Sequence, residues 1–236
     1  DLQPNDPRVD RWIDQLTEMG VTVHLKLANR MELAANKQFV EKLGRYTVLT
    51  TSIRTVSTWE LFLKRLIDIL GGIVGCILTG ILFLILAPMI YHESPGPIFF
   101  RQTRIGKNGK KFTCYKFRSM RVNAQCDTLQ ATEHDPRKTK FGNFLRKSSI
   151  DELPQFINVL RGDMSIVGPR PHMLKHTEEY SELINKYMVR HFIKPGITGW
   201  AQVTGCRGET KELSQMEARI RKDIWYVENW SFWLDI

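Results

Sequence analysis

Two neighbouring carboxylates, Asp151 and Glu152, stand a few residues after the cations Arg146 and Lys147. A carboxylate can attack phosphorus and form an acyl phosphate, while a second carboxylate helps to hold a divalent cation or manages a proton. Phosphoryl transfer needs little covalent machinery but much neutralisation of charge, so such a pair must be surrounded by cations. The segment is therefore a candidate for phosphoryl transfer, with Asp151 and Glu152 as catalytic residues and as ligands of Mg²⁺.

The same segment has a purely structural interpretation. Ser149 and Glu152 have the spacing of a capping box at the start of a helix. Acidic residues in a first helical turn also complement the helix dipole. From this segment alone, the capping interpretation stays open beside the catalytic one.

Four cations are candidates for binding phosphate: Lys116, Arg118, Arg146 and Arg170. For any one of them, a solvated surface charge is the commoner explanation. Arg170 stands between two prolines, which restrict the backbone and would aim its guanidinium reproducibly. These four residues are the candidates for the cationic surroundings that the acidic pair requires, and Arg170 is the best of them.

The run Lys194–Gln202 combines a rigid turn, backbone amides and the aromatic Trp200. Such a loop can hold the base or the phosphates of a nucleotide. The alternative is a structural turn that packs Trp200 into the core, and both interpretations stay open. The six histidines show no metal-ligand spacing, and the four cysteines form no CxxC pair, so neither a zinc site nor a disulfide framework is indicated.

The elements that must position these residues include a long apolar segment. No charged side chain occurs from Ile69 to Tyr91, and 23 helical residues at about 1.5 Å each could cross a bilayer. Pro88 interrupts the helical hydrogen bonds, and basic residues flank both ends. We expect a re-entrant helix that bends near Ala87 and Pro88 and returns to the same face. A spanning helix and a buried core helix are the alternatives.

The rest of the chain predicts a mixed α/β protein. Short strands are expected at Ile98–Phe100 and Phe112–Phe117, and helices at Leu153–Leu160, Met173–Tyr187 and Leu213–Tyr226. Near the amino terminus, a helix from Arg8 to Gly20 and strands at Val21–Leu27 and Tyr46–Thr51 indicate a piece of an α/β unit, followed by a linker at Ser52–Thr58. The chain begins at Asp1 and ends on apolar residues, which is typical of a fragment.

Composition allows one core or one domain plus part of another, because the chain has 236 residues and 42% hydrophobic content. The net charge of +9 favours anionic partners, including phosphates and lipid headgroups. A non-catalytic membrane scaffold that docks anionic lipids or a polymerase explains the charge and the apolar segment, but not the acidic pair beside Arg146. Binding to nucleic acid is not expected, because no recognised binding module accompanies the charge.

Several motifs together resemble the bacterial sugar transferase family, also called monotopic phosphoglycosyl transferases. They are the apolar segment with Pro88, then Ser94–Gln102, Tyr115–Met120, Asp151–Gln155, Gly162–Pro171 and Pro195–Gln202. The resemblance extends from about Trp59 to Ile236. It implies ping-pong transfer of a hexose-1-phosphate from a UDP-sugar to undecaprenyl phosphate, which releases UMP.

The resemblance also implies roles for individual residues. Asp151 would be the nucleophile that carries the phosphosugar, and Glu152 would assist with Mg²⁺ or as a base. Arg146, Lys116 and Arg170 match family positions at the active site. The helix break matches Ala87 and Pro88, with alanine where some members have serine.

The resemblance implies three segments and a location. Residues 1–58 would be the end of a Rossmann-like domain with a linker, 59–93 the re-entrant membrane helix, and 94–236 the catalytic domain. The catalytic domain would face the cytoplasm at the bacterial inner membrane, in contact with membrane lipids. Glucose and galactose are the expected hexoses, and a homodimer formed through the amino-terminal unit is left open.

Overall fold

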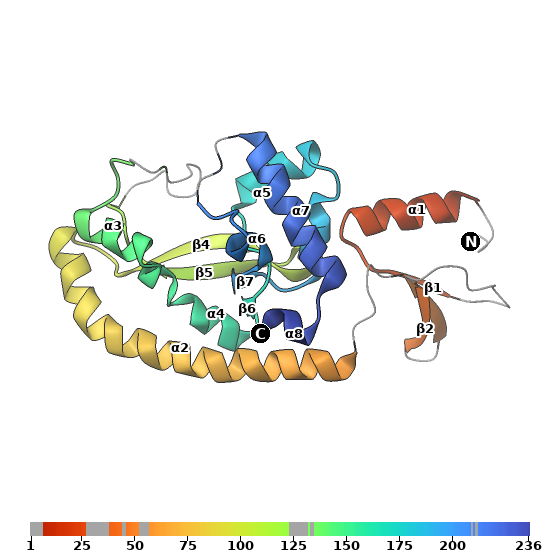
Figure 1. Ribbon diagram of the computed structural model, residues 1–236, viewed down its shortest axis with the longest axis horizontal. Coiled ribbons are helices and arrows are strands. Elements are labelled where there is room, and N and C mark those ends of the chain that lie inside the picture. The colour runs from red at the N-terminus through yellow and green to blue at the C-terminus, as the bar shows by residue number, and fades with distance from the viewer. Residues whose placement is uncertain are drawn as a thin grey trace.

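A computed structural model describes residues 7–26, 38–43, 46–51, 57–122, 132, 135–208, 210 and 212–236 of the chain. One long helix, α2 (Thr58–Glu93), runs beneath a mixed α/β body and curves around it at its C-terminal end (Figure 1). Within the described residues the mixed α/β class is confirmed. The expected linker at Ser52–Thr58 lies mostly outside them.

Helix α2 exposes most of its apolar side chains. Among the described residues it is the helix long and apolar enough to cross a membrane, with 22% of its most apolar window buried. Leu84 is 75% exposed and Val74 66% exposed, which does not fit a helix buried in a soluble core. Its 36 residues remain helical through Pro88, and the yellow C-terminal part of the ribbon turns upward (Figure 1).

Glycines let the opposite face of α2 approach helix α4 (Gln155–Arg161) closely. A Cβ atom on Gly75 would lie 2.2 Å from the ring of Phe156, and one on Gly72 would lie 2.7 Å from Leu160. Larger residues there would force the two helices apart. The apolar sequence therefore has two different faces, one of which packs on protein.

Charged side chains fix the N-terminal half of α2 to the body. Arg65 donates to the carbonyls of Val159 and Leu160 at the end of α4, at 2.7 and 2.8 Å. Asp68 is 3% exposed and accepts hydrogen bonds from Ser165 Oγ and the Ile166 amide, each at 2.9 Å. Burying charges without partners would be unfavourable, so these contacts specify where α2 docks.

An antiparallel hairpin follows α2. Strand β4 (Phe99–Ile105) pairs with β5 (Lys111–Phe117), with Phe99 opposite Phe117. The turn contains the short 3-10 helix η1 (Lys107–Gly109). Phe117 packs in a core cluster with Leu86 of α2 and Leu145, so the hairpin joins the C-terminal end of α2 to the body.

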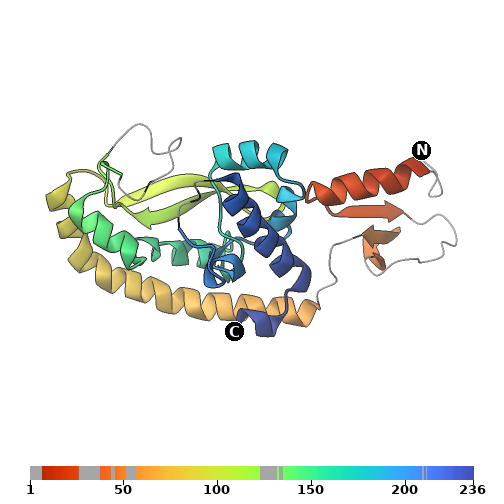
Figure 2. The same ribbon diagram turned by 45° about the horizontal axis from the view of Figure 1, so that its top comes forward.

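The remaining elements complete the body around the hairpin (Figure 2). In chain order they are α3 (Lys140–Lys147), η2 (Ile150–Glu152), α4, β6 (Ser165–Val167), α5 (Leu174–Leu183), η3 (Tyr187–Phe192), β7 (Gly196–Thr198), α6 (Trp200–Val203), α7 (Leu213–Asn229) and α8 (Phe232–Asp235). Strands β6 and β7 pair in parallel. The expected helices near residues 153–160 and 213–226 are confirmed as α4 and α7.

The expected helix Met173–Tyr187 is interrupted. Helix α5 ends at Leu183, and η3 begins after Lys186, which has a left-handed backbone with φ of 60°. A left-handed residue cannot continue an α-helix. The chain therefore turns there and presents the buried side chains of η3 to α7.

The amino-terminal unit contains α1 (Pro7–Glu18) and strands β1 (Val23–Lys26), β2 (Gln38–Leu43) and β3 (Tyr46–Thr51). The predicted helix and both predicted strands are confirmed, and β2 is an additional strand. The strands form an antiparallel sheet in the order β1-β3-β2, whereas a Rossmann-like fold has a mostly parallel sheet. Its relation to a Rossmann-like domain therefore stays a prediction.

Candidate active site

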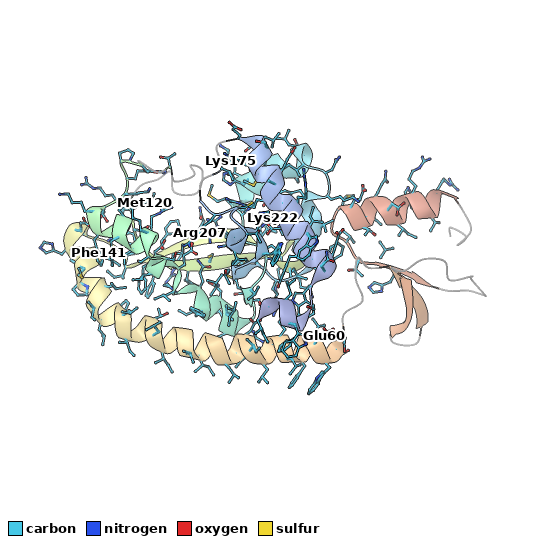
Figure 3. The ribbon with its side chains drawn as sticks, viewed as in Figure 1. Glu60, Met120, Phe141, Lys175, Arg207 and Lys222 are labelled. Atoms are coloured by element: carbon cyan, nitrogen blue, oxygen red, sulfur yellow. The ribbon has the colours of Figure 1, made fainter. Side chains whose placement is uncertain are left out.

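A cavity of about 1150 Å³ lies between the β4–β5 hairpin, η2, the 168–173 segment and the N-terminal half of α7. Met120 and Arg207, labelled in Figure 3 on the body above α2, both line it. The described residues that line it include eleven lysines and arginines but two carboxylates, Asp151 and Glu152. Such a cavity has a strongly positive potential and favours ligands with several negative charges.

The acidic pair lies on the short helix η2. The preceding Ser149 has a left-handed backbone with φ of 59°, and its hydroxyl oxygen accepts a hydrogen bond from Arg207 at 2.6 Å. Ser149 therefore makes no side-chain cap, and the carboxylate of Glu152 is bound elsewhere. The capping-box interpretation is wrong, because tertiary contacts take both side chains.

Glu152 is bound by two of the predicted cations. Lys116 Nζ lies 2.6 Å from one carboxylate oxygen, and Arg170 donates to both oxygens, at 3.0 Å for Nη1. Burial opposes ionisation of Glu152, but the charges of Lys116 and Arg170 outweigh it and lower the pKa of this carboxyl below its usual range. Glu152 is thus ionised at neutral pH and fixed in orientation.

Asp151 has a different environment from its neighbour. It is 6% exposed, and no described side chain forms a hydrogen bond with its carboxylate. Burial raises its pKa, and the charge of Glu152 adds to this effect, while Lys116, Arg146 and Arg170 oppose it. Asp151 therefore combines an unengaged carboxylate with a set of nearby cations, as a nucleophile toward phosphorus requires.

The other two predicted phosphate-binding residues, Arg146 and Arg118, have different environments in the structure. Arg146 lies in the last turn of α3 and lines the cavity. Arg118 also lines it, but its guanidinium donates to the carbonyls of Pro95 and Ser94, at 3.2 Å for Pro95. Arg118 therefore anchors the segment after α2, and a role in phosphate binding stays a prediction.

Arg190, a residue that the sequence analysis did not single out, supports the backbone of Arg170. Arg190 of η3 donates to the Arg170 carbonyl at 2.5 Å and to His172 Nδ1 at 2.6 Å. It also forms a buried ion pair with Asp223 of α7 at 2.8 Å. Burial lowers the pKa of His172 well below its usual value, so its neutral ring can accept the bond. In the sequence, the signal for Arg190 was no more than an arginine in a partly apolar run.

The loop Pro195–Gln202 forms β7 and the start of α6. Gly168 and Gly199 lie so close that a Cβ on Gly199 would be 2.2 Å from the Gly168 carbonyl, so the loop sits directly against the segment that carries Arg170. Trp200 stacks on Trp225 with ring centroids 4.8 Å apart, while Gln202 lines the cavity. The loop thus combines the packing role and a position at the site.

The side chains of the cavity can be compared with the ligands that the predicted Mg²⁺ would need. Among the described residues, no group of three or more His, Cys, Asp or Glu side chains is arranged so that it could hold a metal ion. Mg²⁺ commonly uses one or two carboxylates together with substrate phosphates. Asp151 fits this pattern, whereas Lys116 and Arg170 already take the oxygens of Glu152.

The body thus carries a carboxylate pair in a cationic cavity and, beside it, a long helix with an exposed apolar face. The family profile described as "Bacterial sugar transferase" matches residues 59–236. The chain belongs to the bacterial sugar transferase family.

Three relatives show what the chain is similar to. It is 53% identical over 230 residues to the UDP-glucose:undecaprenyl-phosphate glucose-1-phosphate transferase of Escherichia coli, covering 97% of this chain and 49% of the relative. The Xanthomonas campestris protein of the same name is 49% identical, with 97% and 48% covered. A UDP-N-acetylgalactosamine-undecaprenyl-phosphate N-acetylgalactosaminephosphotransferase of Aeromonas hydrophila is 44% identical, with 74% and 41% covered. The chain thus spans about half the length of these relatives or less.

Proposed function

We propose that this chain carries the catalytic part of an enzyme that transfers glucose-1-phosphate from UDP-glucose to undecaprenyl phosphate. Asp151 carries the proposal, because among the described residues it is buried without a hydrogen-bonding side chain, in a cavity that eleven described lysines and arginines line. The choice of glucose over galactose rests on the names of the relatives that share about half of its residues. We propose that this transfer is the first membrane step of exopolysaccharide or O-antigen synthesis.

In the first half-reaction, a carboxylate oxygen of Asp151 attacks the phosphorus that bears the sugar. A bond forms between this oxygen and phosphorus, the phosphoanhydride bond breaks, and UMP leaves with the bridging oxygen and the electron pair. Arg146, Lys116 and Arg170 surround Asp151 and stabilise the charge that develops on the phosphoryl oxygens.

In the second half-reaction, an oxygen of undecaprenyl phosphate attacks the same phosphorus. The bond to Asp151 breaks, the carboxylate is regenerated, and the diphosphate-linked sugar leaves. No net proton is needed when the acceptor reacts as its dianion. Glu152, bound by Lys116 and Arg170, keeps these two cations in place through both steps.

We include Mg²⁺ in the proposal. The ion would be held by Asp151 and phosphate oxygens of the donor, with Glu152 nearby, and would neutralise charge on the diphosphate.

We further propose that α2 is re-entrant and that the catalytic body faces the cytoplasm. Arg65 and Asp68 at one end, and Leu86 and Ile90 at the other, contact the same body. A helix with both ends on one folded body does not place them on opposite sides of a membrane. The exposed apolar face of α2 then lies in the lipid, with the bend near Ala87 and Pro88 returning the chain to the surface.

Labelling from the two sides of the membrane tests this placement. We expect Trp59→Cys and Lys107→Cys, each in a variant with the native cysteines replaced by serine, to react with an impermeant maleimide from the cytoplasmic side. Trp59 and Lys107 are both exposed and lie on either side of the apolar segment. Labelling of the two positions from opposite sides would show that α2 spans the bilayer.

For the amino-terminal unit, we retain two proposals. Residues 1–58 would derive from a Rossmann-like regulatory domain, and this unit would mediate a homodimer. The described strands of this unit form a three-stranded antiparallel sheet in the order β1-β3-β2.

The transfer activity is tested by release of UMP from UDP-glucose by membranes that contain the protein, with Mg²⁺ and undecaprenyl phosphate. We expect release with UDP-glucose to exceed that with UDP-galactose and UDP-N-acetylgalactosamine. The matching lipid product is measured in the same samples. Absence of UMP release with every donor would contradict the proposed function.

A further inference from the structure

Three buried polar atoms on one wall of the cavity have no hydrogen-bond partner among the described residues. The wall runs from Gln202 in α6 to Arg219 in α7, near the labelled side chain of Arg207 (Figure 3). Gln202 Oε1, Thr210 Oγ1 and Arg219 Nε are buried, and the described part of the chain offers them no hydrogen bond. Buried polar groups are usually satisfied, so a group of unsatisfied atoms beside a cavity indicates a polar ligand.

Arg219 is the strongest feature of this wall. Its side chain lines the cavity, the residue is 8% exposed, and Nη2 donates to the Gly208 carbonyl at 2.9 Å. The carboxylate whose charge acts most on Arg219 is that of Asp223. Asp223 already forms an ion pair with Arg190 at 2.8 Å, although the geometry of this contact is not that of a hydrogen bond. A buried guanidinium without a dedicated carboxylate is unfavourable unless an anion completes the site.

The surroundings of Arg219 make this requirement stronger. Burial lowers the pKa of Arg219, and the positive charges of Arg170 and Arg190 add to this effect, while Asp223 opposes it. Three arginines thus converge, while Glu152 binds Arg170 and Asp223 binds Arg190. Among the described residues, Arg219 is therefore the arginine of these three that has no carboxylate of its own, so an anionic ligand is needed to neutralise its charge.

The position of Arg219 relative to the nucleophile indicates which anion it binds. The strongest charges acting on Asp151 are those of Lys116, Glu152, Arg146 and Arg170. Asp151 lies on η2, whereas Arg219 lies on α7, donates to the Gly208 carbonyl and lines the cavity from the α6–α7 wall. In an in-line displacement the leaving group departs on the side away from the nucleophile.

We propose that Arg219 binds the phosphate of the leaving nucleotide, with Gln202 and Thr210 offering further hydrogen bonds to the same nucleotide. This inference rests on the proposed function, because it names the part of the cavity that holds the nucleotide of the donor. It divides the cationic cavity into two regions. Arg146, Lys116 and Arg170 serve the phosphorus that is attacked, and Arg219 serves the phosphate that departs.

The test is binding of UMP and of uridine to the purified full-length protein in detergent, without turnover. Arg219→Gln is expected to weaken UMP binding about ten- to a hundredfold, as for loss of a charge-assisted hydrogen bond. Binding of uridine, which lacks the phosphate, is expected to change less than threefold. The matched control is Arg221→Gln on the same helix, where the side chain is exposed and the same charge is lost.

The other outcomes overturn the proposal. Equal weakening of UMP and uridine would mean that Arg219 only shapes the cavity, and unchanged UMP binding would mean that it does not contact the phosphate. Weaker binding of a short polyprenyl phosphate, with UMP unaffected, would assign Arg219 to the acceptor. UMP binding is measured separately from UMP release, so wild-type protein that binds UMP but releases none from UDP-sugars would contradict the proposed function alone.

Discussion

Asp151→Asn is expected to abolish the phosphosugar adduct and to reduce UMP release at least about a thousandfold, as for loss of a covalent nucleophile. The amide has nearly the same shape but cannot attack phosphorus. The measurement is intact-protein mass spectrometry of enzyme treated with UDP-glucose and quenched before the lipid acceptor is added. Wild-type protein should gain the mass of one hexose phosphate, located at residue 151 by peptide mapping. UMP release at the wild-type rate from the variant would contradict a role for Asp151 as nucleophile.

The same substitution should leave the protein folded, which separates lost chemistry from lost structure. Burial raises the pKa of Asp151 in the folded state, so its ionisation opposes folding above the pKa of the unfolded chain. Replacement by a neutral amide removes this unfavourable term. We therefore expect the thermal unfolding temperature of Asp151→Asn to equal or exceed that of the wild type at pH 7. The difference should disappear as the pH falls and the wild-type carboxyl becomes protonated in both states.

Glu152→Gln is expected to reduce UMP release about a hundredfold and to destabilise the protein by about 2 kcal/mol. The amide leaves Lys116 and Arg170 without their carboxylate, and a displaced Arg170 no longer meets the phosphoryl group correctly. The stability change lies below the range typical of buried ion pairs, because the Arg170 side chain is 34% exposed. Chemical denaturation and the UMP assay measure the two effects.

Glu178→Gln is the matched control, because Glu178 is an exposed residue of α5 outside the cavity lining. It should change neither the activity nor the free energy of unfolding. If Glu152→Gln lost stability but kept full activity, Glu152 would only support the local fold. If it lost activity without any loss of stability, its ion pairs would contribute nothing to folding.

Local patterns predicted the main elements and the centre of the site. The uncharged run Ile69–Tyr91 became the apolar part of α2, and the runs 153–160 and 213–226 became helices. These features depend on side-chain periodicity and on the absence of charge, which neighbouring residues in the sequence determine. The acidic pair at 151 and 152 was found in the same way, and Lys116, Arg146 and Arg170 are among its surroundings.

Other features depended on contacts between distant residues. Ser149 and Glu152 have the spacing of a capping box, yet Arg207, Lys116 and Arg170 bind their side chains instead. Arg118 was grouped with the phosphate-binding cations but donates to carbonyls that follow α2. Each of these partners lies at least 18 residues away along the chain, so no local pattern contains it.

The sequence by itself determined the family, the long apolar helix, and the acidic pair with cations near it. Only the tertiary structure decided that Glu152 is bound and Asp151 is unengaged, that α2 contacts the body at both ends, and that Arg219 lies buried at the cavity. The physical reason is that periodicity and residue type are local properties. By contrast, the pairing of charges and the burial of one carboxylate beside another are set by which distant segments the fold brings together.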